Sequence, residues 1–293
     1  GPSRPEEVKP FLENVLQGIS VPPARFDEVL RHYAAVGGSS PYIAMANRQK
    51  DSLQAWLRSN GCDFTVAAAF RHSFPSFQDA FEIFKKHGIE RVIGFVLSPF
   101  RSYSSFEKYQ QRVQEGREKA GASHIELFYT EPFHREPLFL QAQADLIRRT
   151  LKDVPKDDAF FLFTAHSIPE VISSQSDYEG QFRETSSDIA EVLDLEQWAA
   201  VYQSRSGNPS EPWLAPDVRD FVAVLPPELG RLVFVPVGFT CENVEILYDL
   251  DIECRKITVE TGFEYLRAPA ANDHPLFIEM MGKLILEKAK ENA

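Results

Sequence analysis

One histidine stands where a side chain could take part in chemistry. His166 follows the apolar run at 160–164, which has the length and composition of a buried strand. A histidine at the end of a strand can act as a base near neutral pH or as a metal ligand. Taken alone, His166 fits a structural role, in which its ring bonds to the backbone, better than a chemical one.

Three acidic residues follow a second strand-like run, at 232–237, and they are spaced four residues apart. They are Glu245, Asp249 and Glu253. A four-residue step advances only about 40° around an α-helix, so the three carboxylates form a slanted row on one face. Like charges in a row repel one another unless a cation offsets them, and divalent cations accept carboxylate and imidazole ligands. A solvated helix face is the alternative, but the position after a strand favours a path for a cation.

The surrounding sequence alternates between strand-like and helical patterns, which indicates parallel strands covered by helices. Strands are expected over 64–70, 91–97, 124–128, 159–164, 199–203 and 232–237. Helices are expected over 6–16, 25–33, 48–59, 76–87, 106–119, 137–151, 180–192, 217–221, 242–253 and 275–290. Ligand sites of such sheets lie at the carboxyl ends of strands. The polar segments that follow three of the strands, at 98–105, 165–169 and 238–245, are therefore expected to carry the chemistry.

Composition narrows the class of protein. The net charge of −12 argues against a nucleic-acid partner. No stretch approaches the roughly 20 apolar residues of a membrane-spanning helix, so at most a peripheral membrane contact is expected. The three cysteines, Cys62, Cys241 and Cys254, are widely separated and include no C-x-x-C pair. This sparse set predicts neither a zinc ribbon nor a redox pair and suits a reducing compartment, so a cytoplasmic location is expected.

Five segments of the chain share their sequence and order with one enzyme family. They are 37–41 (GGSSP), 163–169 (FTAHSIP), 202–205 (YQSR), 212–217 (PWLAPD) and 235–249, which begins VPVGF and ends EILYD. Together they resemble the ferrochelatases, which insert ferrous iron into a porphyrin, and the resemblance extends over essentially the whole chain. It implies haem biosynthesis as the pathway, with Fe²⁺ and a porphyrin as the partners.

The resemblance also implies a fold. Ferrochelatases consist of two similar Rossmann-like domains, each with a parallel four-stranded sheet flanked by helices, and a porphyrin cleft between them. The expected domains are 1–99 with the C-terminal helix at 272–293, and 100–271. Family members begin with a short apolar strand before the Gly-x-Pro turn, whereas this sequence starts at Gly1. A missing first strand, and hence a fragment of a longer protein, is therefore expected.

The site that the resemblance implies centres on His166 and Glu245, which are expected to be catalytic and to contact the metal at the porphyrin centre. Asp249 and Glu253 are expected to line a metal route. Contacts to the porphyrin are expected from Ser39, Arg71, Phe100, Tyr103, Gln203 and Trp213.

The chemistry of insertion accounts for these residue types. Two pyrrole protons must leave, and the flat macrocycle must bend to expose its nitrogen lone pairs, a strain offset by binding energy elsewhere. His166 can take a proton or ligate iron, and Glu245 can take a proton or hold His166 in place. Which residue does which stays open at this point.

The sequence departs from parts of the family pattern. Some ferrochelatases hold an iron–sulfur cluster on four cysteines, whereas this chain has three, so neither a cluster nor any other permanently bound cofactor is expected. The hydrophobic lip insertion of membrane-associated members is absent. The loop at 204–212 resembles the coproporphyrin III branch more than the protoporphyrin IX branch, and both substrates stay open. A monomer and a side activity with Zn²⁺ are also expected.

Two other functions remain as alternatives. A sirohydrochlorin chelatase would use cobalt, nickel or iron on a related architecture, but such chains usually rely on two histidines. A non-catalytic tetrapyrrole-binding protein would bind stoichiometrically without turnover. The presence of both His166 and Glu245 argues against a pure binder, which has no need of a proton acceptor.

Overall fold

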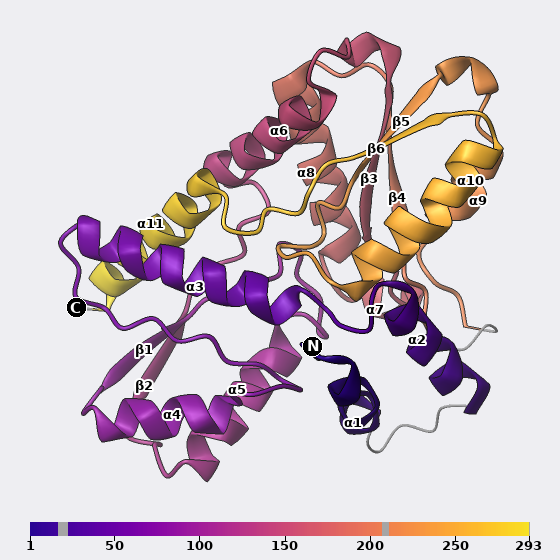
Figure 1. Cartoon of the computed structure of the whole chain (residues 1–293). Coiled ribbons are helices and arrows are strands. Elements are labelled where there is room, and N and C mark those ends of the chain that lie inside the picture. The colour runs from indigo at the N-terminus through magenta and orange to yellow at the C-terminus, as the bar shows by residue number, and fades with distance from the viewer. Residues whose placement is uncertain (17–22, 207–210, 293) are drawn as a thin grey trace. The chain divides into compact units, whose positions relative to one another are not determined.

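The computed structural model describes residues 1–16, 23–206 and 211–292, and it divides into two compact units (Figure 1). Unit 1 comprises residues 1–96, 104–131 and 278–293, and unit 2 comprises residues 97–103 and 132–277. The expected boundary at residue 99 differs from this division, because residues 104–131 return to unit 1 and supply a strand of its sheet. Both units are of the α/β class, as predicted.

Unit 1 is built around a short parallel sheet. Its strands β1 (Arg91–Gly94) and β2 (Glu126–Tyr129) pair in parallel. Its helices are α1 (Pro5–Val15), α2 (Pro23–Ala35), α3 (Tyr42–Ser59), α4 (Phe77–Lys86), α5 (Glu107–Lys119) and all but the first three residues of α11 (Pro275–Glu291). The C-terminal helix expected over 275–290 is thus confirmed.

The four-stranded sheet expected in each domain is wrong for unit 1, where the described residues form two strands. The strand expected over 64–70 is not formed, and these residues belong to no described helix or strand. Their backbone bonds to a side chain instead: the Gln54 amide donates to the Phe64 carbonyl at 2.6 Å and accepts from the Val66 N–H at 2.9 Å. An amide that satisfies these groups takes the place of a sheet ladder.

The packing of unit 1 follows from local sequence signals. Ser76 caps α4 by accepting from the Asp79 N–H, while Asp79 accepts from the Ser76 N–H, which forms a capping box. Phe81 of α4 then packs into a small buried cluster with Ala122 and Ile125, at the start of β2. The sheet of unit 1 is therefore held mainly by α4 and α5.

Unit 2 contains a complete four-stranded parallel sheet with the order β4-β3-β5-β6. The strands are β3 (Phe160–His166), β4 (Trp198–Gln203), β5 (Arg231–Val235) and β6 (Glu264–Arg267). The interior of β3 and nearly all of β5 are buried, as expected for parallel strands covered on both faces. The strands predicted over 159–164, 199–203 and 232–237 are confirmed, with ends shifted by one or two residues.

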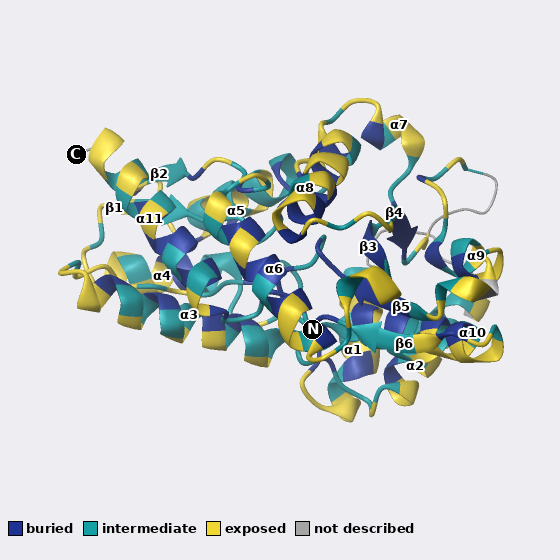
Figure 2. Cartoon of the chain, turned by 90° about the horizontal axis from the view of Figure 1, so that it is seen from above, coloured by how far each residue is buried: buried dark blue, intermediate teal, exposed yellow. Residues whose placement is uncertain are grey.

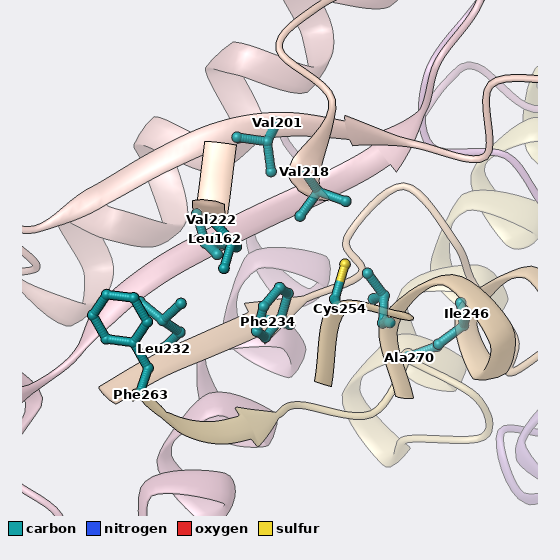
Figure 3. Packing of buried hydrophobic residues seen from close by; sticks show 11 residues of the cluster. Leu162, Val201, Val218, Val222, Leu232, Phe234, Ile246, Cys254, Phe263 and Ala270 are labelled. Atoms are coloured by element: carbon teal, nitrogen blue, oxygen red, sulfur yellow. The ribbon is translucent and has the colours of Figure 1, made fainter. Parts of the chain in front are cut away.

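Helices cover both faces of this sheet. The helices α6 (Pro137–Leu151) and α8 (Tyr178–Leu193) lie on one face, where Phe182 packs edge-on against Tyr202. The other face is covered by α9 (Val218–Ala223), η3 (Ile246–Cys254) and α10 (Arg255–Glu260), whose apolar residues pack on Leu162, Phe234 and their neighbours (Figure 3). Figure 2 shows the central strands in dark blue and much of α10 in yellow.

Short elements complete unit 2: the helix α7 (Glu170–Ser173) and the 3₁₀ turns η1 (Lys156–Asp158) and η2 (Pro227–Leu229). Among all described helices of the chain, none is both long enough and apolar enough to cross a bilayer.

The parallel sheet of unit 2 brings the carboxyl ends of its strands to one edge, here called the strand-end edge. The register places His166, the last residue of β3, opposite Gln203, the last residue of β4. After β5 ends at Val235, the Gly238 N–H donates to the Thr164 carbonyl at 3.0 Å. The polar segments that follow β3, β4 and β5 therefore meet at this edge, where ligand sites of such sheets lie.

The segment that carries the acidic row differs from the α-helix expected over 242–253. Residues Ile246–Cys254 form a π-helix, η3, which continues as α10 from Arg255. A π-helix bonds each N–H to a carbonyl five residues back, and it is frequent at functional sites. The wider turn was not predicted, because a segment of nine residues is too short for its apolar periodicity to separate a π-helix from an α-helix.

Candidate functional site at the strand-end edge

His166 is held by its own backbone neighbourhood at the end of β3. Its Nδ1 lies 2.5 Å from the Ser167 carbonyl oxygen. A carbonyl only accepts, so Nδ1 carries a proton, and in the neutral ring Nε2 then presents the lone pair. The hydroxyl of Tyr178 donates to the His166 carbonyl at 2.9 Å, which fixes the residue from the α8 side. The ring therefore has one anchored and one reactive nitrogen.

The loop after His166 is tied to two other segments. The Ser167 N–H donates to the Gln203 carbonyl at 2.7 Å, and the Ser167 hydroxyl donates to the Leu214 carbonyl at 2.9 Å. The Leu214 N–H donates in return to the Ile168 carbonyl at 3.0 Å. These bonds hold the loop after His166 against the end of β4 and against the segment at 212–217. The three segments therefore form one connected part of the structure.

Glu245 faces the reactive nitrogen of His166. Its Oε1 lies 3.8 Å from Nε2, which is an ion-pair distance and longer than a hydrogen bond. The two side chains are 46 % and 29 % exposed, so both can be reached from solvent. Asn243 positions Glu245, because its Oδ1 accepts from the N–H groups of Glu245 at 2.9 Å and Ile246 at 3.1 Å. The predicted pairing of His166 with Glu245 is present in the structure.

Asp249 lies deeper in the row. It accepts a hydrogen bond from the Ser204 hydroxyl, at the end of β4. The pKa of Asp249 is raised from 3.8 to about 7, chiefly by burial and to a smaller extent by the charges of Glu245 and Glu253, against the opposing hydrogen bond from Ser204. Asp249 therefore changes its charge near neutral pH, which is unusual for an aspartate.

Glu253 is not a free carboxylate. Its Oε2 lies 3.1 Å from Nη1 of Arg219, which also bonds Asp217. The carboxylate at this end of the predicted metal route is therefore already paired with a cation. Within the described part of the chain, no three His, Cys, Asp or Glu side chains converge closely enough to hold a metal ion.

Four of the six expected porphyrin contacts lie in unit 2. Tyr103 is 51 % exposed and Trp213 is half-buried, with an indole N–H that has no partner among the described residues. Gln203 is buried and accepts from the Thr164 hydroxyl at 2.7 Å. Phe100 is fully buried, so its ring belongs to the core and offers no face to a macrocycle.

The other two expected contacts, Ser39 and Arg71, lie in unit 1. The guanidinium carbon of Arg71 is 5.9 Å from the centre of the Tyr109 ring, and its Nε is buried without a partner in the described residues. Burial and the charges of Arg71, Arg112 and Lys108 lower the pKa of His72 to about 4. Arg71 therefore belongs to a cluster of positive charge.

Two residues of the site were not predicted from the sequence, Ser204 and Arg219. Ser204 adopts a left-handed backbone conformation with φ of 63°, which turns its hydroxyl toward Asp249. Its position directly after a strand was a usable signal, since polar residues there line ligand sites. Arg219 follows Asp217, the N-cap of a helix, and only the fold reveals that it reaches Glu253.

The backbone beside His166 leaves no space at Gly238. A Cβ there would lie 2.7 Å from the Ala165 Cβ and 2.8 Å from the Ala165 Cα. We expect Gly238→Ala to lower the free energy of unfolding by about 1–3 kcal/mol, because overpacking forces β3 to shift. Urea unfolding measures this. Gly180→Ala in α8 is the matched control, since its added Cβ meets nothing within 4 Å. Equal stability of the two variants would contradict the packing described.

Known proteins provide an independent comparison. A profile of the family described as Ferrochelatase matches residues 1–289. A ferrochelatase of Rhodopirellula baltica is 38% identical over 293 residues, which covers 98% of this chain and 83% of that protein. A coproporphyrin III ferrochelatase of Oceanobacillus iheyensis is 33% identical and covers 99% of this chain and 94% of its own length.

Solved structures agree on the fold. The sirohydrochlorin chelatase SirB of Bacillus subtilis subspecies spizizenii, in complex with cobalt, superposes with a TM-score of 0.54 at 11% identity, over 85% of this chain and 89% of that one. CbiX, the terminal enzyme of siroheme biosynthesis in denitrifying bacteria, gives 0.55 at 15% identity, over 92% and 95%. At such identities the likeness establishes the chelatase fold alone. The family profile and the full-length relatives go further, and they show that the chain belongs to the ferrochelatase family.

Proposed function

We propose that this chain inserts ferrous iron into a porphyrin in haem biosynthesis. The observation that carries the proposal is the pair of His166 and Glu245, with Nε2 and Oε1 3.8 Å apart at the strand-end edge. Both side chains are partly exposed, so a substrate can reach them. Membership of the ferrochelatase family, and relatives that bear that name over nearly their full length, support the same activity.

The proton balance of insertion assigns roles to the pair. One Fe²⁺ ion replaces two pyrrole N–H protons, so the site must accept two protons per turnover. His166 offers the Nε2 lone pair, because its Nδ1 proton is engaged with the Ser167 carbonyl. Glu245 stabilises the resulting imidazolium and is placed to take the second proton. Both groups then release their protons to solvent.

Iron is a substrate in this scheme, and the acidic row supplies it. Fe²⁺ accepts carboxylate and imidazole ligands. Asp249, held by Ser204, lies between Glu245 and Glu253 along the row. An ion that must leave for the porphyrin is served better by successive weak contacts than by one closed site. Zn²⁺ accepts the same ligands, so zinc insertion is part of the proposal.

The proposed porphyrin is coproporphyrin III. Several relatives are named coproporphyrin III ferrochelatases, including one of Listeria monocytogenes at 33% identity. The loop at 204–212 supports the same branch, although its residues 207–210 lie outside the described part of the chain. Coproporphyrin III carries more carboxylates than protoporphyrin IX, and Arg71 is proposed to pair with one of them. Ser39, Tyr103, Gln203 and Trp213 are the remaining proposed contacts.

The proposal includes the setting of the reaction. We place the reaction in the cytoplasm, since a sparse set of cysteines suits a reducing compartment. The proposed enzyme is a monomer. No iron–sulfur cluster is proposed, because three cysteines are fewer than the four that such a cluster takes. Cys241 and Cys254 are buried in addition, and burial raises the pKa of the Cys254 thiol, which makes it a poor metal ligand.

An anaerobic insertion assay tests the function. We offer Fe²⁺ or Zn²⁺ with coproporphyrin III and, separately, with protoporphyrin IX, and follow the absorbance of the metalloporphyrin. The expected result is multiple turnover with both metals and a kcat/KM at least about tenfold higher for coproporphyrin III, because an additional charge-assisted bond favours it. Higher kcat/KM with protoporphyrin IX would contradict the proposed substrate but not the activity.

The alternatives give different outcomes in the same assay. A non-catalytic tetrapyrrole-binding protein would shift the porphyrin spectrum stoichiometrically and stop. A sirohydrochlorin chelatase would turn over sirohydrochlorin with cobalt or iron and leave both porphyrins unchanged. The structural likeness to SirB concerns the fold alone, and the sequence relatives favour the porphyrin.

A further inference from the structure

Arg219 is brought to the strand-end edge by the backbone that precedes it. The Tyr202 N–H donates to the Pro216 carbonyl at 2.9 Å, and Tyr202 forms a parallel bridge with Asp217. These contacts hold the start of α9 beside the end of β4. Asp217 then caps the helix by accepting from the Arg219 N–H at 2.9 Å. The guanidinium is thereby placed next to the acidic row.

The guanidinium joins two carboxylates from different elements. Its Nε and Nη2 donate to the two oxygens of Asp217 at 2.9 Å and 3.0 Å, in a bidentate arrangement. Its Nη1 donates to Glu253 Oε2 at 3.1 Å. The bonds to Asp217, followed by the charges of Asp217, Glu253 and Asp249, raise the pKa of Arg219 further above its ordinary value. Arg219 is thus a permanent cation of the row.

A permanent cation changes what the row can do with a metal ion. A divalent ion that reaches Glu253 must compete with the guanidinium for the same carboxylate oxygen. Without this competition, Glu253 and Asp217 would become available beside Asp249, and the added negative charge would hold the ion more firmly. A substrate ion held too firmly does not pass on to the porphyrin.

We propose that Arg219 is a positioning residue that limits how firmly the acidic row holds the incoming metal ion, by occupying Glu253 and Asp217. The inference rests on the proposed function, in which the row carries the substrate metal. In this role Arg219 weakens the affinity of the row for the metal ion, whereas the acidic residues strengthen it.

Titration calorimetry with Zn²⁺ alone, without porphyrin, tests the inference on the whole chain. We expect Arg219→Gln to bind Zn²⁺ about tenfold more tightly than the wild type, because one charge beside a divalent ion is removed at a partly exposed position. Arg219→Lys keeps the charge and is expected to stay near wild-type affinity. Arg231→Gln is the matched control, because Arg231 pairs with Glu264 at the opposite, amino-terminal end of its strand.

A second variant identifies the carboxylate involved. The double variant Arg219→Gln/Glu253→Gln is expected to return Zn²⁺ affinity to about the wild-type value, because the released carboxylate is gone. In the insertion assay, Arg219→Gln is expected to lower both KM for the metal and kcat. Partial unfolding would lower the apparent kcat but would not lower KM. Arg219→Met removes the same charge and replaces Arg219→Gln if that variant melts early.

Three results would overturn the inference. They are unchanged or weaker Zn²⁺ binding in a folded Arg219→Gln or Arg219→Met, equally tight binding in Arg219→Lys, and equal tightening in Arg231→Gln. Failure of the proposed function is a separate result, because it is seen in the wild type as absent turnover, whatever the affinities of the variants.

Discussion

Replacing His166 with alanine is expected to reduce kcat for metal insertion by about a thousandfold, the usual contribution of a positioned general base. The imidazole Nε2 is the proposed acceptor of a pyrrole proton, and in the variant Glu245 loses the partner whose protonated form it is proposed to stabilise. KM for the porphyrin is expected to change far less, because the ring is bound mainly by other residues.

The measurement is steady-state insertion of Zn²⁺ and of Fe²⁺ by wild type and variant, with a thermal melt to confirm folding. His124→Ala removes an exposed histidine of unit 1 and serves as the matched control. A kcat within about tenfold of the wild type would show that another group takes the pyrrole protons. An equal loss of kcat in His124→Ala would contradict the assignment of His166 to the catalytic site.

The pairing of His166 with Glu245 was predictable because it depends on two local signals. Each residue follows an apolar run that is long enough for a buried strand, and parallel strands carry their carboxyl ends to one edge. Folding then needs only the correct strand order to bring the two together. The alternation of strands and helices does not specify that order, and the structure shows that β3 lies between β4 and β5.

Other parts of the site depend on contacts that no local pattern encodes. The link from Arg219 to Glu253 joins residues 34 positions apart on two elements of different type. The π-helix differs from an α-helix by about one residue per turn, and its nine residues form too few turns for the apolar pattern to reveal the difference. Phe100 resembled a ligand contact because it follows a strand, but its ring fills the core against Tyr178 and Phe182.

The expected strand at 64–70 shows a similar limit in the fold. Its composition is that of a buried strand, but a strand exists only where a neighbour completes its ladder. The side chain of Gln54 satisfies the backbone of Phe64 and Val66 instead. Propensity therefore predicted a strand that the fold does not form, because strand pairing is a property of the tertiary structure.

Asp249→Asn is expected to raise the free energy of unfolding and to lower kcat/KM for the metal. The gain in stability is expected to depend on pH. Burial raises the pKa of Asp249 from an ordinary value of 3.8 to about 7. Between these values the folded chain binds a proton that the unfolded chain releases, so the contribution of Asp249 to stability falls as pH rises from about 4 to 7. The asparagine amide has no charge to bury and keeps an oxygen that can accept from Ser204.

The free energy of unfolding of Asp249→Asn should therefore match the wild type near pH 4 and exceed it above pH 7. The shift corresponds to at most about 4 kcal/mol, and about 1–3 kcal/mol is expected after allowance for solvent screening. Urea unfolding at pH 4, 6 and 8 measures the difference. Asp63→Asn, at an exposed position of unit 1, is the control and should show no such trend.

The same substitution separates stability from function. At pH 8, kcat/KM for the metal should fall by about tenfold or more, because a charged ligand of the row is lost while the fold becomes more stable. In the wild type, kcat/KM for the metal should also decline as pH drops below 7 and Asp249 takes up a proton. The variant should lack the part of this decline that comes from Asp249, so its profile should be flatter than that of the wild type. If both proteins show the same pH profile, Asp249 does not carry the metal, and the route to His166 and Glu245 must lie elsewhere.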